Sequence, residues 1–368
     1  MTIAISGTTG IALAGQFDSA STFGFKNRII NGAMVIDQRN AGASTNADAN
    51  KYTLDRWTTG ISQTNKFTVQ QNAGSVTPPA GYTKYLGITS SSAYTLLTAD
   101  FFTIQQPIEG LNMADLAWGT ASAATVTLSF WVRSSLTGTF GFAIKNSAGD
   151  RSYPATYTIN SANTWEQKSI TITGDTTGTW LTTNGVGMYT QFGLGVGTTY
   201  SGAAGAWAAA NYLGATGATS VVGTNGATFY ITGVQLEESS TATSFDVRSY
   251  GTELALCQRY YYRVTSTGTS RIFGNGYVNS STISDCTLPF PVTMRDDPSA
   301  LEQTGTASNY VVVAGAGNVT CSAVPTHQTS SQWGAQFRLT VASGLTAGQA
   351  TFARGAVAGT YLGWSAEL

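Results

Sequence analysis

The chain has 368 residues, of which only 10% are charged, and its formal net charge at pH 7 is -1. A nucleic-acid-binding surface needs clustered basic residues and a high isoelectric point, so we expect no nucleic-acid partner. Hydrophobic residues make up 42% of the chain and aromatic residues 11%, which is enough apolar surface for folding. With 42 glycines beside them, this composition is typical of strands and turns, and the length suits two domains.

Residues 1–24 are rich in Gly, Ser, Thr and Ala, and they predict an extended N-terminal arm. The opening MTIAISGTTG has neither the basic nor the apolar segment of a signal peptide. No stretch of the chain approaches the roughly 18 consecutive apolar residues of a membrane span. We therefore expect neither a signal peptide nor insertion into a membrane.

The cysteine and histidine content limits the chemistry of the chain. Three cysteines, Cys257, Cys286 and Cys321, form no C-x-x-C pair, and their odd number argues against a disulfide framework and against a zinc site. The single histidine, His327, lies in the polar run VPTHQTSSQ. We expect reduced, partly buried thiols, no metal and no cofactor, and no catalysis of the classes that depend on histidine.

Short alternating segments recur between turn clusters from residue 25 to about residue 248. This pattern is typical of a β-sandwich or jelly roll, and we find no helix longer than three turns within it. The clearest predicted strands are residues 125–133, 139–145, 155–160, 168–173, 187–196 and 228–237.

Residues 249–263 break the strand pattern. Thr252 followed by Glu253 and an apolar run favours a short helix, so we place the domain boundary here. Beyond it we predict a smaller C-terminal β-sandwich domain over residues 264–368. Its expected strands are residues 271–279, 283–294, 309–314, 319–324, 335–342, 348–353 and 359–367.

Five segments together resemble a group of bacteriophage structural proteins, the tail-fibre or virion proteins that carry a jelly roll like that of a carbohydrate-binding module. The segments are NRIINGAMVIDQRNAG (27–42), YTLDRW (52–57), and residues 107–135, 146–160 and 227–263. The resemblance covers residues 25 to 263, and it extends more loosely to residues 288–300 and 363–368.

The resemblance implies a jelly roll for residues 25–248, location in the virion and other virion proteins as partners. We also expect a homo-oligomer, because a weakly charged, Gly-rich chain with many strand edges needs those edges covered. The expected contacts are residues 1–24, the stripe at 252–262 and part of the C-terminal domain, and the resemblance to phage fibres implies a trimer. Related modules carry an acidic residue in the last strand, near a bound calcium ion. This chain has Thr232 and Gly233 at that place, so no family-type metal site is expected.

Strand alternation selects candidate ligand-binding residues. If Leu128, Phe130 and Val132 point inward, then Trp131 and Arg133 point outward. The same argument places Lys145, Tyr189 and Gln191 outward, and Trp207 lies in the loop sequence 200–213 together with Tyr200 and Tyr212. Aromatic, amide and cationic groups suit a saccharide, and these residues could share one surface. A second interpretation is that Trp131 lies under a loop or an adjoining subunit.

The aromatic run that follows the predicted helix suggests an interface. Leu254, Cys257 and Tyr261 have helical spacing and form an apolar stripe beside Tyr260. We assign Leu254, Cys257, Tyr260 and Tyr261 to an oligomer interface, with packing between the two domains as the alternative.

A glycosidase needs two carboxylates about 5 to 9.5 Å apart. The first domain contains Glu109, Asp115, Asp150, Glu166 and Asp175, but the sequence does not pair them, and two of the five lie in turn sequences. We predict a non-enzymatic tail-fibre or host-adhesion subunit that binds a host-surface saccharide. The alternative is a purely structural virion component without a ligand.

Overall fold

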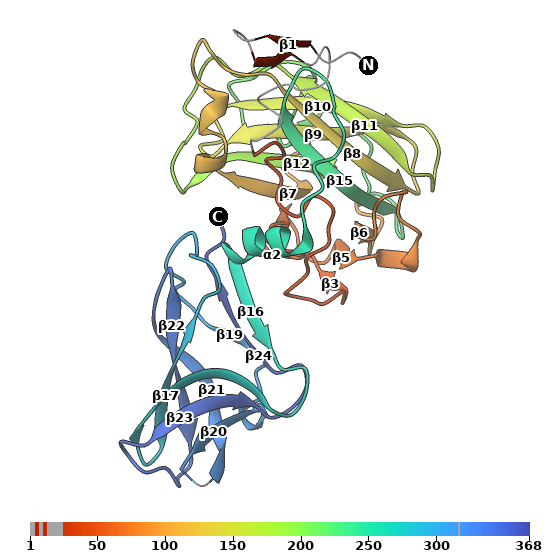
Figure 1. Ribbon diagram of the computed structural model, residues 1–368. Coiled ribbons are helices and arrows are strands. Elements are labelled where there is room, and N and C mark those ends of the chain that lie inside the picture. Colours follow the sequence, from red (N-terminus) through yellow and green to blue (C-terminus); the bar gives the residue numbers. More distant parts are fainter. Residues whose placement is uncertain (1–3, 7–9, 13–24, 316) are drawn as a thin grey trace.

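The computed structural model describes residues 4–6, 10–12, 25–315 and 317–368. Strands account for 43% of the residues and helices for 6%, which confirms the all-β class. Figure 1 shows two bodies, one above the other, with a short helix between them. Most of the expected N-terminal arm lies outside the described residues. Within it, only the antiparallel pair of β1 (Ala4–Ser6) and β2 (Gly10–Ala12) is described.

The first domain is a sandwich of two antiparallel sheets, which confirms the predicted jelly roll. The five-stranded sheet has the order β10 (Ser152–Ile159), β9 (Gly138–Asn146), β12 (Val186–Val196), β7 (Phe101–Glu109) and β4 (Thr58–Ile61). The six-stranded sheet has the order β11 (Glu166–Ile172), β8 (Val126–Ser134), β15 (Thr228–Glu238), β6 (Leu86–Ser90), β5 (Phe67–Gln71) and β3 (Thr45–Asn46).

The core of this domain lies between the two sheets. Phe192 of β12 is its centre, with its ring centroid 5.0 Å from that of Phe130 and 5.2 Å from that of Phe142. All three rings are fully buried. Because β12 sends Phe192 inward, its neighbours Tyr189 and Gln191 belong to the outer face of the five-stranded sheet.

Short elements complete the first domain. They are the parallel pair β13 (Ser201–Gly202) and β14 (Gly214–Ala215), and the 3₁₀ turns η1 (Ala73–Ser75), η2 (Gly110–Asn112) and η3 (Ala114–Leu116). Strand β15 is irregular between Thr232 and Gln235, where Gly233 has a φ of 59°. Here the Thr232 hydroxyl donates to the Lys84 carbonyl at 2.7 Å, so this position, acidic in related modules, contributes to sheet structure.

The predicted helix is confirmed as α2 (Tyr250–Gln258). It begins earlier than expected because the Ser249 side chain, rather than that of Thr252, accepts the hydrogen bond that caps it. The tyrosine run then forms β16 (Tyr261–Thr265). This strand pairs with β24 (Tyr361–Ser365), which in turn pairs with β19 (Glu302–Gln303).

The remaining strands of the second domain form a closed barrel in place of the expected sandwich. Their order is β17 (Arg271–Ser280), β18 (Ile283–Pro289), β22 (Gly334–Val341), β21 (Gly317–Ser331), β20 (Tyr310–Ala314) and β23 (Ala350–Gly355), with η4 (Ala307–Asn309) before β20. Closure follows because β23 pairs with both β17 and β20. Alternation along a strand is the same in a barrel and a sandwich, so the sequence did not separate them.

Charged and aromatic side chains from both domains are buried together at the junction. The Arg56 guanidinium forms an ion pair with Glu367, donates to the Pro107 carbonyl at 2.6 Å and lies 3.6 Å from the centre of the Tyr260 ring. The Gln38 amide donates to the Tyr261 carbonyl at 2.9 Å. These contacts fix the second domain against the first.

The assignment of the aromatic stripe to an oligomer interface is therefore corrected. Cys257, Tyr260 and Tyr261 are fully buried within one chain, and Leu254 packs against the same cluster as Cys257 and Tyr260. A second subunit cannot reach rings that the two domains already cover. These residues instead pack between the two domains, as the alternative interpretation predicted.

The three cysteines are free, and they are buried more completely than the partial burial expected from the sequence. In the described part of the chain, no helix is both long enough and apolar enough to cross a membrane.

Candidate functional site: a pocket on the five-stranded sheet

A pocket of about 230 Å³ lies on the outer face of the five-stranded sheet. Three of the predicted ligand-binding residues line it, namely Lys145 of β9 and Tyr189 and Gln191 of β12. Strand register brings them together. On one side of β12, Tyr189 lies opposite Lys145 of β9, and on the other side Gln191 lies opposite Gln105 of β7. The other lining residues are Asn50, Gly60, Phe101, Thr103, Gln105, Tyr200, Asn211 and Leu213.

Gln191 is the most informative residue of the pocket floor. Its side chain is 1% exposed, yet its amide nitrogen has no hydrogen-bond partner among the described residues. A buried donor without a partner costs about 1–3 kcal/mol of desolvation, and such groups are few in native proteins. Since Gln191 lines the pocket, its free N–H groups are available to a bound molecule.

Glycine keeps the floor open on the β4 side. A Cβ on Gly60 would lie 2.6 Å from the Thr103 hydroxyl and 3.1 Å from the Gln105 side-chain oxygen. Any larger residue at position 60 would therefore collide with the polar side chains of β7 that line the pocket. The small residue exposes these groups to the space above the sheet.

Lys145 supplies the positive charge of the pocket. Its ammonium donates to the Asn211 side-chain oxygen at 3.1 Å and lies 5.1 Å from the centre of the Tyr189 ring. It forms no ion pair with a carboxylate in the described part of the chain. Burial lowers the pKa of this ammonium and raises the pKa of the Tyr189 hydroxyl. A bound anion would offset the desolvation of the ammonium.

One wall of the pocket comes from the loop sequence 200–213. The Tyr200 ring packs edge-on against Phe101 at a centroid distance of 5.3 Å, and the Leu213 amide donates to the Tyr200 carbonyl at 2.7 Å. Asn211 of the same loop accepts from Lys145. The loop therefore positions both an aromatic ring and an amide beside the strand residues.

A second cavity, of about 370 Å³, adjoins the first through Asn50, which lines both. The first domain contributes Arg39, Asn40, Asn50, Lys51 and Tyr52, and the second contributes Arg263, Glu302, Tyr361 and Ser365. The Arg39 and Arg263 guanidiniums each lie over a tyrosine ring, at 3.4 Å and 3.5 Å from its centre. This cavity, which we call the junction cavity, contains three cationic side chains and one carboxylate.

The structure does not place all the predicted ligand-binding residues on one surface. Trp131 and Arg133 belong to β8 of the six-stranded sheet, whereas Lys145, Tyr189 and Gln191 belong to the five-stranded sheet. All of them point outward, so the two groups lie on opposite faces of the sandwich. The expectation of a single shared surface is wrong because alternation gives the orientation of a side chain but not the sheet that its strand joins.

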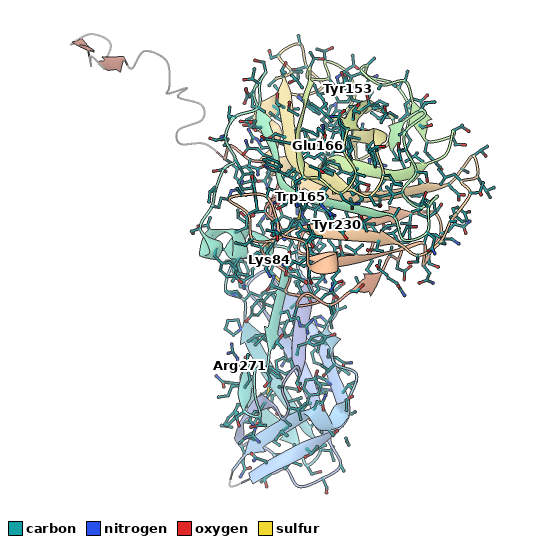
Figure 2. All side chains as sticks on the ribbon, turned by 90° about the vertical axis from the view of Figure 1, so that its right-hand side faces the viewer. Lys84, Tyr153, Trp165, Glu166, Tyr230 and Arg271 are labelled. Atoms are coloured by element: carbon teal, nitrogen blue, oxygen red, sulfur yellow. The ribbon has the colours of Figure 1, made fainter. Side chains whose placement is uncertain are left out.

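Trp131 and Arg133 lie on a face with its own aromatic cluster. Arg133 pairs across the strands with Tyr230, whose ring centroid is 5.1 Å from that of Tyr85. Trp165 packs edge-on against Tyr85 at 5.5 Å. Figure 2 labels Trp165, Tyr230 and Lys84 along the side of the sandwich. Tyr85 and Tyr230 are buried in this cluster, which leaves little ring surface for a ligand.

Trp207 does not line the pocket, although its loop does. Its ring centroid lies 5.4 Å from that of Trp118 and 5.5 Å from that of Trp180, and its N–H donates to the Thr173 carbonyl at 2.8 Å. Trp207 therefore anchors the loop to the sandwich, while Tyr200 and Asn211 of the same loop reach the site.

Sequence reasoning missed the contribution of β7. Its sequence FFTIQQPIE is buried on both faces, so it lacks the alternation that identified the other strands. The sequence feature that could have indicated a role for this strand is a pair of amide side chains within an apolar run. Gln106 binds the backbone N–H and carbonyl of Ile30, each at 2.8 Å, and Gln105 lines the pocket.

None of the five carboxylates considered for glycosidase chemistry lines the pocket. Each binds a structural partner. Glu109 pairs with Arg259, Asp115 with Arg28 and Asp175 with Arg151, while Asp150 accepts from Asn146 and Glu166 accepts from the backbone N–H groups of Asn160 and Ser161. In the described part of the chain, no group of three or more His, Cys, Asp or Glu residues is arranged to hold a metal ion.

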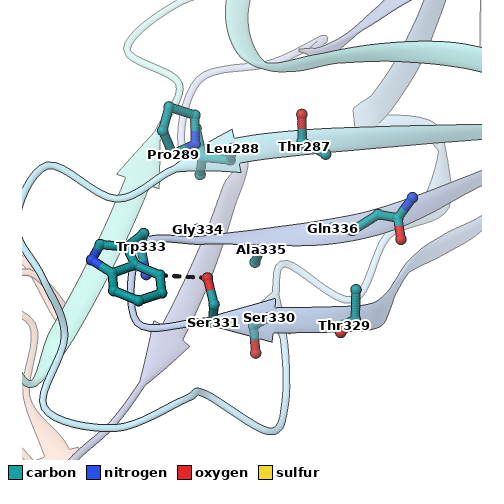
Figure 3. A pocket seen from close by; sticks show the side chains of 10 residues that line it. All are labelled: Thr287, Leu288, Pro289, Thr329, Ser330, Ser331, Trp333, Gly334, Ala335 and Gln336. Carbon is teal, nitrogen blue, oxygen red and sulfur yellow. Dashed lines mark hydrogen bonds between the residues drawn. The ribbon is translucent and has the colours of Figure 1, made fainter.

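Another hollow, of about 770 Å³, lies on the barrel and is shown in Figure 3. Trp333 lies at the turn between β21 and β22 with 69% of its surface exposed, and its backbone N–H donates to the Ser331 hydroxyl at 3.3 Å. The other lining residues are Thr287, Leu288, Pro289, Thr329, Ser330, Gly334, Ala335 and Gln336. No buried side chain with an unpaired polar atom lines this hollow, which distinguishes it from the pocket of the first domain.

Comparison with known proteins finds matches of structure only. No family model and no curated protein sequence matches the chain. A tailspike protein domain of bacteriophage CBA120 is 12% identical with a TM-score of 0.30, and the alignment covers 57% of this chain but only 21% of the tailspike chain. A family 11 carbohydrate-binding module of Clostridium thermocellum is 13% identical with a TM-score of 0.27, covering 55% of this chain and 100% of that one. A sugar-binding protein of Bacteroides thetaiotaomicron is 12% identical with a TM-score of 0.33, covering 58% and 100%.

Proposed function

We propose that the first domain binds a saccharide in the pocket on the five-stranded sheet. The observation that carries the proposal is the buried amide of Gln191, a residue that lines the pocket and whose side-chain nitrogen has no hydrogen-bond partner among the described residues. Amides, hydroxyls and aromatic rings surround it, which are the groups that hold sugars through hydrogen bonds and stacking. The pocket is smaller than the roughly 300–1,000 Å³ of drug-sized sites, so it suits a short saccharide unit.

The lining favours binding over hydrolysis. Glycoside hydrolysis requires a carboxylic acid and a carboxylate on either side of the scissile bond. The pocket instead offers an ammonium, amides, hydroxyls and rings. We therefore propose a non-catalytic binding role.

We propose further that the chain is a bacteriophage virion protein, a tail-fibre or host-adhesion subunit that attaches to a host-surface saccharide. The support is the sequence resemblance over residues 25–263, combined with a pocket suited to sugars. The second candidate, a structural virion component without a ligand, is favoured by the buried ion pair of Arg56 with Glu367, which joins the two domains. Cryo-electron microscopy of the virion separates them, because an adhesion subunit must expose the pocket at a distal position.

A glycan array followed by titration tests the binding site. Tyr189→Ala removes a ring from the pocket and is expected to weaken binding by about 0.5–1.5 kcal/mol. Trp131→Ala removes a ring from the opposite face and is expected to leave binding unchanged. The site is wrong if a folded Tyr189→Ala variant binds like the unmodified chain while Trp131→Ala does not.

A further inference from the structure

The pocket and the junction cavity together carry an excess of positive charge. Lys145 is the only charged residue that lines the pocket. Beyond Asn50, the junction cavity is lined by Arg39, Lys51 and Arg263 against the single carboxylate of Glu302. Arg39 pairs with Glu302 at 3.2 Å and with Glu367 at 3.4 Å, whereas Lys145, Lys51 and Arg263 form no ion pair in the described part of the chain. Three cations without a carboxylate partner therefore lie along this path, in a chain whose net charge is -1 and of which only 10% of residues are charged.

The pocket floor also contains hydrogen-bond donors that have no partner among the described residues. The Lys145 ammonium has three donors, and only the one directed at Asn211 has a hydrogen-bond partner among the described residues. The Gln191 amide nitrogen has two donors and no partner. A floor with spare donors and a cation selects a ligand rich in acceptors, and a carboxylate or sulfate has more lone pairs than a sugar hydroxyl.

The strand register allows one anionic group to meet both donors. Lys145 of β9 lies opposite Tyr189 of β12, and Gln191 is two residues beyond Tyr189 on β12. Lys145 and Gln191 are therefore diagonal neighbours on one face of the sheet. Diagonal neighbours on adjacent strands are about 7–8 Å apart at Cα, within reach of long side chains. A carboxylate between them can accept from both.

We infer that the saccharide of the pocket is anionic, with one acidic group held by Lys145 and Gln191 and the glycan continuing past Asn50 toward the cations of the junction cavity. This inference rests on the proposed function, because it names the class of saccharide for the same pocket. The path crosses from the first domain to the second, so both domains contribute to recognition. The junction contacts described above keep the two halves of the path in place.

A glycan array that presents acidic glycans beside their carboxyl-reduced or desulfated counterparts tests the inference. We expect binding to the acidic members, at least tenfold stronger than to their neutral counterparts, since a hydrogen bond to a charged group contributes about 1.5–3 kcal/mol. Binding should weaken as sodium chloride is raised, because salt screens the ion pairs. Separate carboxylated and sulfated members show which acidic group the pocket prefers, and either preference supports the inference.

Two lysine variants localise the effect. Lys145→Gln should lose most of the preference for acidic glycans, while Lys84→Gln, which changes a lysine just before β6 of the six-stranded sheet, should keep it. Equal binding of acidic and neutral glycans overturns the inference and leaves the saccharide site intact. Acidic preference that survives in a folded Lys145→Gln variant also overturns it. Absence of binding to every glycan on the array contradicts the inference and the proposed function together.

Discussion

Removing the Glu367 carboxylate is expected to destabilise the junction between the domains. Its oxygens accept from the guanidiniums of Arg56 and Arg39, and the Glu367 and Arg56 side chains are only 5% and 1% exposed. Opposite charges about 4 Å apart attract by about 4 kcal/mol at an effective dielectric constant near 20. Breaking a buried pair by removing one partner costs about 3–5 kcal/mol. We therefore expect Glu367→Ala to lose about 3–5 kcal/mol of unfolding free energy.

A carboxylate at the surface of the same domain provides the matched control. Asp296 is 57% exposed and lies 3.7 Å from Arg295, an arrangement that contributes at most about 1 kcal/mol. Urea denaturation followed by tryptophan fluorescence measures both variants, with separate transitions fitted if the two domains unfold apart. The reasoning is refuted if Glu367→Ala and Asp296→Ala differ from the unmodified chain by the same small amount.

Two further predictions follow from burial, and a third concerns the oligomeric state. Burial raises the pKa of Asp55 from 3.8 to about 6, so this group favours the folded state most below pH 3.8, and that contribution is lost as pH rises through 6. Denaturation at pH 5 and pH 7 should show a smaller stability difference in Asp55→Asn than in the unmodified chain, and an equal difference would contradict the assignment. Burial also raises the pKa of Cys286 to about 11 and of Cys321 to about 12, so we expect a thiol reagent at pH 8 to label neither until the protein is unfolded by urea. Rapid labelling of the native protein would count against this. Finally, we predict a homo-oligomer, such as a trimer, formed through surfaces other than the buried tyrosines, and mass photometry that finds a stable monomer would contradict it.

Much of the fold was predictable because the strands of the sandwich alternate. The segment 187–196 was read correctly as a strand with Phe192 inward and Tyr189 outward. The partner of each strand was not predictable, because register and sheet order depend on contacts distant in sequence. Trp131 and Tyr189 follow the same local pattern, yet their strands belong to different sheets.

Part of the site was predictable for the same reason. Lys145, Tyr189 and Gln191 were selected by their outward orientation and chemistry, and the structure brings these three together. Gln105 was missed because its strand is buried on both faces, and Asn50 because a left-handed turn residue carries no strand signal. Such residues can be assigned to a site only when the sheet that they face is known.

The central claim is that a saccharide binds on the five-stranded sheet, and a crystal structure of the protein with the strongest ligand from the glycan array tests it most directly. We predict sugar density in contact with Lys145 and Gln191, with the chain leaving the pocket past Asn50. Density against Trp131 on the opposite sheet, or beside Trp333 on the barrel, with the pocket empty, would contradict the account.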